Sequence, residues 1–402
     1  MKHLVIIGLV VPEPASTAAG SRMLQLIEIF RQNNYKITFL SSASHSEFSE
    51  KINVTKIELN DDSFDDLIKE LQPDIVLFDR FVTEEQFGWR VLENCPNVLK
   101  ILDTEDLHFL REARRTAFNE KRKIEENDYF NSVFKREIAS ILRCDLSLII
   151  SEFEFELLTE KLNINPETLF YIPFLADDFS RNNPDFASRK HFASIGNFLH
   201  EPNWQTVLLL KKFWKNIRKQ LPDTEIHIYG AYPSEKVFQL HNEKEGFIIK
   251  GRADSAERIF KEYRVLSAPI PFGAGLKGKL FESMKYGIPN ITTSVGAEGM
   301  TFNTLWNGKI ADDETEFVQE AVALYQNETL WNECQKNGYE IIEQKFMKKD
   351  FDKKLLSAVE TIENNLQQHR NRNFIGMILQ HHSLQSTKYM SKWIEEKNKR
   401  IL

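Results

Sequence analysis

The stretch APIPFGAGLKGKLFESMKYGIPNITTSVGAEGM, from Ala268 to Met300, combines six glycines, two closely spaced lysines and a glutamate within a helical pattern. APIPF is typical of the end of a buried strand, GAG of a tight turn, and LKGKLFESMKY of a helix closed by Gly287 and Pro289. The stretch therefore predicts a strand, a glycine turn, a helix and a second strand. This order is that of one unit in a parallel sheet covered by helices.

The residues at the turn predict an anion site. In an open α/β sheet, backbone N–H groups and the positive end of the following helix face the crevice beyond the strand's carboxyl end. Gly273 and Gly275 would let the chain pass close to a phosphate, and Lys277 and Lys279 would add positive charge. Glu282 follows within the first turns of the helix, where its carboxylate can accept hydrogen bonds from sugar or ribose hydroxyls. These features predict half of a nucleotide-sugar site.

Length and composition set the broad class. A chain of 402 residues predicts two or three domains, and a formal charge of -7 gives no reason to expect nucleic acid as a partner. The three cysteines lie far apart without metal-ligand or C-x-x-C spacing, which favours a reducing compartment. The first apolar run is too short to span a membrane. We therefore expect a cytoplasmic protein, with at most a weak peripheral contact with the inner face of the membrane.

The order of apolar runs predicts two doubly wound α/β domains. Strand and helix patterns alternate along the first half, including one long charged helix over about residues 107–143, and the alternation restarts after a polar, proline-containing passage. We predict a first domain over residues 1–172, a second over 173–366, and a polar, basic helical tail over 367–402 that packs back on the first domain. Two such domains would face each other across a central cleft.

The second-domain stretch and four shorter segments carry a family resemblance. Those segments are VPEPASTAAGSR (11–22), CDLSLIISEFE (144–154), LFYIPF (169–174) and SIGNFLHEPN (194–203). In their order and spacing they resemble the GT-B glycosyltransferases, specifically the retaining family called glycosyl transferases group 1. The resemblance covers the chain to about Leu366. It implies two Rossmann-like domains with a nucleotide-diphospho-sugar donor bound mainly by the second and an acceptor bound mainly by the first.

The resemblance also implies roles for residues of the second domain. Glu282 would hold the donor ribose. The diphosphate would be faced by Gly273, Gly275, Lys277 and Lys279, and approached by Gly196 and Asn197. Two departures stand out. Ala274 occupies the position where the family commonly has a second glutamate, and Asn197 and His200 stand where it often has an arginine and a lysine.

In the first domain, the segment ILDTEDLHFLREARR follows a strand and predicts the catalytic side of the cleft. We expect Asp103 and His108 to position the acceptor hydroxyl. Further acceptor or cleft residues would be Gly20, Arg22, Glu105 and Arg111. In transfer with retention, the leaving phosphate can itself accept the proton, so no protein base is required. The only D-x-D lies late, at Asp350 to Asp352, so we expect neither a metal nor a cofactor besides the donor.

Other interpretations remain open. The glycine turn could serve packing alone, and the departures from the family pattern are compatible with a catalytically silent protein that binds a nucleotide or a partner. A nucleotide-sugar epimerase could use the same architecture. The acceptor class extends over glycans, glycolipids and other hydroxyl compounds. The basic, aromatic segment KKFWKNIRK (211–219) suits either an interfacial helix or, more simply, a helix that covers the sheet.

Overall fold

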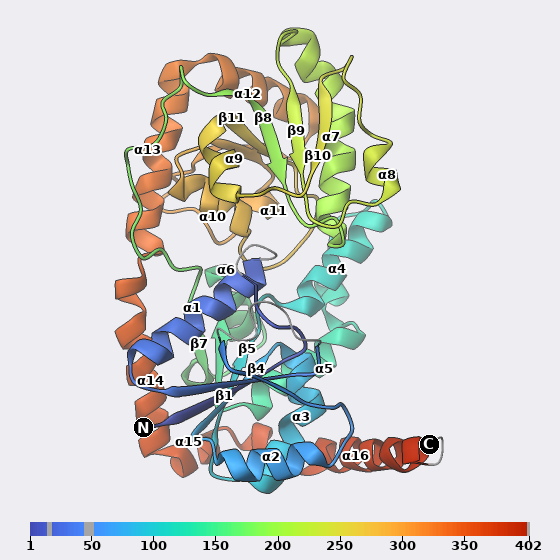
Figure 1. Cartoon of the computed structure of the whole chain (residues 1–402), viewed down its shortest axis with the longest axis vertical. Coiled ribbons are helices and arrows are strands. Elements are labelled where there is room, and N and C mark those ends of the chain that lie inside the picture. The colour runs from blue at the N-terminus through green and yellow to red at the C-terminus, as the bar shows by residue number, and fades with distance from the viewer. Residues whose placement is uncertain (14–17, 44–51, 400–402) are drawn as a thin grey trace.

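Two parallel sheets, each covered by helices, organise the chain, and they lie one above the other along its long axis (Figure 1). The computed structural model describes residues 1–13, 18–43 and 52–399. The first sheet has the strand order β3-β2-β1-β4-β5-β6-β7 and the second β10-β9-β8-β11-β12-β13. The predicted pair of doubly wound domains is thus confirmed. Residues 14–17 of the quoted segment 11–22 lie outside the described residues.

The first domain is built from the first half of the chain. Its strands are β1 (His3–Gly8), β2 (Lys36–Ser41), β3 (Val54–Lys56), β4 (Ile75–Asp79), β5 (Leu99–Asp103), β6 (Leu146–Ile149) and β7 (Leu169–Tyr171). Its α-helices among the described residues are α1 (Ala18–Gln32), α2 (Ser63–Leu71), α3 (Phe81–Asn94), α4 (His108–Asn119), α5 (Ser132–Arg143) and α6 (Glu152–Glu156). The strands β1, β4 and β5 in the middle of the sheet are wholly buried because helices cover both faces.

The second domain repeats this plan. Its strands are β8 (Lys190–Ile195), β9 (Ile226–Tyr229), β10 (Phe247–Gly251), β11 (Tyr263–Ala268), β12 (Asn290–Thr292) and β13 (Gly308–Ile310). Its helices are α7 (Glu201–Gln220), α8 (Glu235–Phe238), α9 (Ala256–Glu262), α10 (Gly278–Lys285), α11 (Ser294–Ala297), α12 (Glu314–Gln326) and α13 (Glu328–Lys345). Phe213 and Trp214 of α7 are buried, so the basic segment 211–219 belongs to a helix that covers the sheet.

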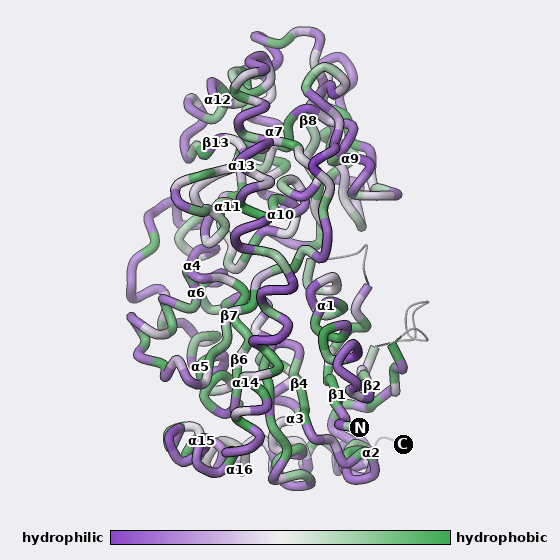
Figure 2. The backbone as a smooth tube through the Cα atoms, turned by 90° about the vertical axis from the view of Figure 1, so that its left-hand side faces the viewer, coloured by the Kyte–Doolittle hydropathy of each residue, from purple (hydrophilic) through white to green (hydrophobic). Residues whose placement is uncertain are grey.

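The end of the chain returns to the first domain. Helix α13 runs down one side of the molecule and is followed by α14 (Asp352–Asn364), α15 (Leu366–Arg372) and α16 (Phe374–Lys399) (Figures 1 and 2). Leu355 and Val359 of α14 share a hydrophobic core with Leu4 of β1. The chain therefore re-enters the first domain through α14, before the boundary that the sequence analysis placed at residue 366.

The single long helix predicted over about residues 107–143 is wrong. Helix α4 ends at Asn119, a short 3₁₀ turn follows at Glu126–Phe130, and α5 begins at Ser132. The side chain of Asn131 accepts hydrogen bonds from the first N–H groups of α5 and so fixes its start. The charged pattern is shared by two helices that pack side by side, and this brings α5 next to the amino end of α4.

Candidate functional site

The glycine turn between β11 and α10 packs directly against the first domain. Gly275 has a φ of 61°, and a Cβ placed there would lie 2.7 Å from the Cβ of Asp106. Its N–H donates a hydrogen bond to Oε1 of Glu154, at 2.7 Å. Glycine is thus required here both by the left-handed backbone and by the close approach of the first domain. The sequence analysis explained Gly275 by the approach of a ligand, whereas the structure shows contact between the domains.

The two predicted lysines lie at the start of α10 and donate hydrogen bonds to uncharged oxygens. Nζ of Lys277 donates to the carbonyl oxygen of Gly275 at 2.7 Å, and Nζ of Lys279 donates to Oδ1 of Asn203 at 2.8 Å. Neither forms an ion pair with any residue in the described ranges. Burial lowers the pKa of each to about 8. An anion bound beside them would offset this cost and favour their charged forms.

The other residues predicted to bind the donor are Glu282, Gly196 and Asn197. Burial raises the pKa of Glu282, on the next turn of α10, to about 7. A Cβ on Gly196 would lie 2.7 Å from the side chain of Asn203, which also donates to the carbonyl oxygen of Asn197. Asn203 therefore links the turn after β8 to Lys279. The sequence analysis missed this role, because an asparagine in the first turn of a helix is an ordinary surface residue.

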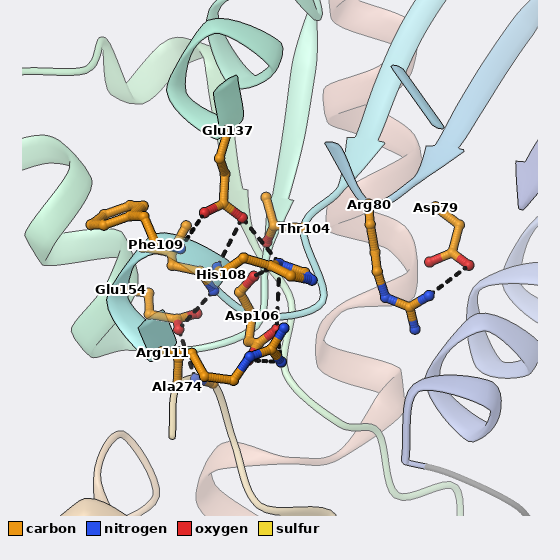
Figure 3. A network of polar contacts seen from close by, with 12 residues as sticks. Asp79, Arg80, Thr104, Asp106, His108, Phe109, Arg111, Glu137, Glu154 and Ala274 are labelled. Atoms are coloured by element: carbon orange, nitrogen blue, oxygen red, sulfur yellow. Dashed lines mark hydrogen bonds and ion pairs between the residues drawn. The ribbon is translucent and has the colours of Figure 1, made fainter. Parts of the chain in front are cut away.

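On the first-domain side, Glu137 of α5 organises the amino end of α4 (Figure 3). Its carboxylate accepts hydrogen bonds from the N–H groups of His108, at 3.0 Å, and Phe109, at 2.8 Å. The same carboxylate lies 3.2 Å from Nδ1 of His108. Donation from Nδ1 leaves Nε2 to accept a hydrogen bond. Burial lowers the pKa of His108, but the carboxylates of Asp106 and Glu137 outweigh it, so the pKa lies above its ordinary value.

Arg111 and Asp106 form an ion pair beside His108 (Figure 3). The guanidinium donates to both oxygens of Asp106, at 3.0 and 2.7 Å. Burial opposes ionisation of Asp106, but Arg111 and His108 hold its pKa below the ordinary value. His200 approaches from the second domain, and burial together with Arg111 lowers its pKa to about 4. His200 is therefore neutral at physiological pH.

The structure places Asp103 and Arg22 in the interior, which corrects their predicted acceptor contacts. Both are almost wholly buried, and the guanidinium binds both oxygens of Asp103, at 2.9 to 3.2 Å. Arg22 also donates to the carbonyl oxygens of Ile172 and Pro173. The pair therefore joins α1, β5 and the start of the linker between the domains, and it has no surface on which to meet a substrate.

Gly20 also packs against protein. A Cβ there would lie 2.5 Å from the backbone oxygen of Glu13, so the chain itself occupies the space that we expected a ligand to approach.

Two first-domain side chains that the sequence analysis did not assign join the domains across the cleft. Glu154 accepts from the N–H groups of Leu107 and Gly275, and burial raises its pKa to about 8. Arg114 donates to the carbonyl oxygen of Gly273 at 2.7 Å and forms a two-bond ion pair with Glu298, at 2.8 and 2.7 Å. The cleft is therefore closed in this structure. Such contacts depend on two domains meeting, so no local sequence pattern reveals them.

A cavity of about 580 Å³ lies beside these contacts. It is lined from the first domain by Arg114 and Phe118, and from the second by Pro271, Val295 and Glu298. In the described part of the chain, no group of three or more His, Cys, Asp or Glu residues is placed to hold a metal ion. The side chains around the cleft can thus bind an anion, accept hydrogen bonds from hydroxyls and exclude water.

The sequence and the fold were both compared with those of known proteins. Residues 189–327 match the family model described as Glycosyl transferases group 1. No curated protein sequence matches the chain. Among solved structures, TarM from S. aureus, in complex with fondaparinux, α-GlcNAc-glycerol and UDP, is 9% identical with a TM-score of 0.70 and covers 90% of this chain and 100% of its own.

Two further solved structures have a similar fold. Sucrose-phosphate synthase from Thermosynechococcus elongatus is 12% identical with a TM-score of 0.70 and covers 90% of this chain and 99% of its own. The pneumococcal O-GlcNAc transferase GtfA, in complex with UDP and GlcNAc, is 13% identical with a TM-score of 0.65 and the same coverage, 90% and 99%. At these identities the structures establish the shared fold, and the family match adds a similarity in sequence over residues 189–327. The chain therefore has the fold of the GT-B glycosyltransferases, and its residues 189–327 are similar to the glycosyl transferases group 1 family.

Proposed function

We propose that the protein transfers a sugar from a nucleotide-diphospho-sugar to a hydroxyl group of a glycan, glycolipid or other acceptor, with retention and without a metal ion. The observation that carries the proposal is the start of α10, where Lys277 and Lys279 have no ion pair with any described residue and Glu282 follows one turn later. Two cations and the positive end of a helix form a site for a diphosphate. Solved relatives that contain UDP make this nucleotide the first to test.

The proposed transfer breaks the bond between the anomeric carbon and the β-phosphate oxygen and forms a bond to the acceptor oxygen. The acceptor's proton passes to the leaving phosphate oxygen, so atoms and charge balance without a protein base. Lys277, Lys279 and the amino end of α10 stabilise the negative charge that develops on the diphosphate. No metal ion is needed for this step.

We assign the acceptor hydroxyl to the side of the cleft that carries His108. Its side chain is 18% exposed, and in the neutral ring donation from Nδ1 to Glu137 leaves Nε2 as the acceptor atom. A hydroxyl that donates to Nε2 would be held for attack on the anomeric carbon. In this proposal His108 keeps the positioning role that the sequence predicted, while Asp103, buried against Arg22, does not contact the acceptor.

Thermal-shift measurements test the proposal. UDP, GDP, ADP, CMP and TDP and their sugar conjugates are compared on the wild type and on Glu282→Ala. Stabilisation by one nucleotide family, reduced in the variant, is the expected result. Tight binding with no hydrolysis or transfer of any donor would support the silent protein instead, and conversion of one nucleotide sugar into its epimer would support the epimerase. Unchanged binding in Glu282→Ala would contradict the assigned site.

We also propose that this cytoplasmic enzyme makes a weak peripheral contact with a membrane through α16. The outward side chains of this helix are unusually apolar. They include Phe374, Ile378, Tyr389 and Trp393, each more than half exposed. No helix of the described ranges is long and apolar enough to cross a membrane. Co-sedimentation with anionic phospholipid vesicles that Trp393→Ser weakens is expected, and no co-sedimentation of the wild type would refute the contact.

A further inference from the structure

A second group of polar side chains lies at the carboxyl ends of β4 and β5, outside the network of His108. Asp79 ends β4 and pairs in register with Asp103 of β5, and the N–H of Arg80 donates to the carbonyl oxygen of Asp103 at 2.8 Å. Strand β4 lies beside β1, where the order of the first sheet reverses. In open α/β sheets, ligands bind in the crevice beyond the strands at such a reversal.

Two buried carboxyl groups in this place each have one oxygen without a hydrogen-bond partner among the described residues. Asp79 is 5% exposed and Glu105 is 9% exposed. Oδ1 of Asp79 and Oε1 of Glu105 have no hydrogen-bond partner among the residues that the structure describes. A buried polar atom without a partner costs about 1–3 kcal/mol, so such atoms call for an explanation. Burial, with the neighbouring carboxylates, raises the pKa of both groups.

Arg80 supplies donors to the same place and reaches solvent. Its guanidinium has one polar partner within the described ranges, Oδ2 of Asp79 at 3.5 Å, and its side chain is 25% exposed. Figure 3 shows Asp79 and Arg80 joined to each other, to one side of the residues around His108. Arg80 and Glu105 both have left-handed backbones, with φ values of 69° and 64°. A guanidinium N–H donates only, and a carboxylate accepts only.

We infer that Asp79, Arg80 and Glu105 form a subsite that binds two neighbouring hydroxyl groups of a neutral sugar in the acceptor. This inference rests on the proposed function and adds the acceptor's chemical class. A hydroxyl donates to an unpartnered carboxyl oxygen and accepts from the guanidinium, so a vicinal diol satisfies all three residues at once. Asp103 is paired with Arg22. The unpartnered oxygens of Asp79 and Glu105 suit a hydroxyl donor better than a phosphate, whose oxygens accept, and Arg80 repels an ammonium group. The side chain of Phe81 next to Arg80 contacts the ring of His108, so the subsite adjoins the predicted transfer position.

The test uses the full chain saturated with UDP and the probes methyl α-glucoside, methyl β-galactoside, methyl α-mannoside, methyl β-N-acetylglucosaminide and glycerol 3-phosphate. Saturation-transfer NMR measures probe binding, and calorimetry measures UDP binding. We expect at least one methyl glycoside to bind the wild type and to lose affinity about tenfold or more in Asp79→Asn and Glu105→Gln. Glu112→Gln, which changes an exposed glutamate paired with Arg115, is the matched control and should bind as the wild type does.

The outcomes separate the two proposals. UDP binding in each variant shows that it folds, and Arg80→Lys, at a partly exposed position, provides an independent variant. UDP binding without any glycoside binding, glycoside binding unchanged in the subsite variants, or binding of glycerol 3-phosphate alone overturns the subsite and leaves the proposed donor site intact. Failure of the wild type to bind any nucleotide overturns the proposed function itself.

Discussion

The charged groups on the two sides of the cleft come from the chain in different ways. On the second-domain side, one continuous segment supplies the glycine turn, Lys277, Lys279 and Glu282, and in the part of the chain that the structure describes the lysines form no ion pair. On the first-domain side, four elements supply the groups, and carboxyl groups predominate. The contrast shows that a cationic half-site can be encoded locally by a turn and a helix start. A carboxyl-rich half-site must be assembled from distant segments.

The largest expected effect is the loss of UDP affinity when Lys277 or Lys279 is removed. Lys277→Ala and Lys279→Ala should each weaken UDP binding about 10- to 100-fold, because each removes a charge-assisted hydrogen bond worth about 1.5–3 kcal/mol. The double variant should lose more than either. Calorimetric titration measures the effect, with Lys336→Ala, an exposed lysine of α13, as the control. Unchanged affinity in both single variants would show that the diphosphate does not bind at the start of α10.

Two adjacent arginines of α4 test whether contacts across the cleft stabilise the closed form. Arg114→Ala should lower the free energy of unfolding by about 1–3 kcal/mol, because it leaves the largely buried Glu298 without its partner. Arg115→Ala removes only an exposed pair with Glu112 and should change it by less than about 0.5 kcal/mol. Thermal unfolding of the two variants gives the comparison. Equal Tm values would mean that the contact of Arg114 adds nothing to the folded state.

The carboxyl group of Glu154, which lies between the domains, should make the free energy of unfolding depend on pH. The pKa of Glu154 is about 8 in the folded chain against an ordinary 4.5, so the folded state holds an extra proton between these values. Stability from this residue is therefore fully present below pH 4.5 and is lost as pH rises through 8. Glu154→Gln cannot ionise, so its Tm relative to the wild type should increase from pH 5 to pH 8.5. A constant difference across this range would contradict the raised pKa.

The smallest expected change concerns the ring of His108. Asp106 and Glu137 raise its pKa against the effect of burial, so Glu137→Gln should lower that pKa. Titration followed by NMR measures it, with the signal assigned by comparison with His108→Asn. A pKa that stays the same in Glu137→Gln would show that this carboxylate does not set the protonation of the ring.

Much of the donor side could be predicted from the sequence. The strand, turn and helix around Gly275 form where they were expected, because residues close in sequence determine them. The acceptor side was predicted less well. The segment that contains Asp103 and His108 was correctly placed after a strand, yet only the fold shows that Asp103 is buried against Arg22 while His108 is partly exposed. Burial depends on what packs over a residue, which the segment itself does not contain.

The sequence by itself determined the two parallel α/β domains and the cationic turn, since hydrophobic periodicity, glycine conformation and helix ends are local properties. The tertiary structure alone decided the partners of the charged groups. Glu137 reaches His108, Glu154 reaches Gly275 and Arg114 reaches Glu298 across separations from 29 to 184 residues. Hydrogen bonds and ion pairs act over a few ångströms in space. Only the folded chain brings such distant residues within that range.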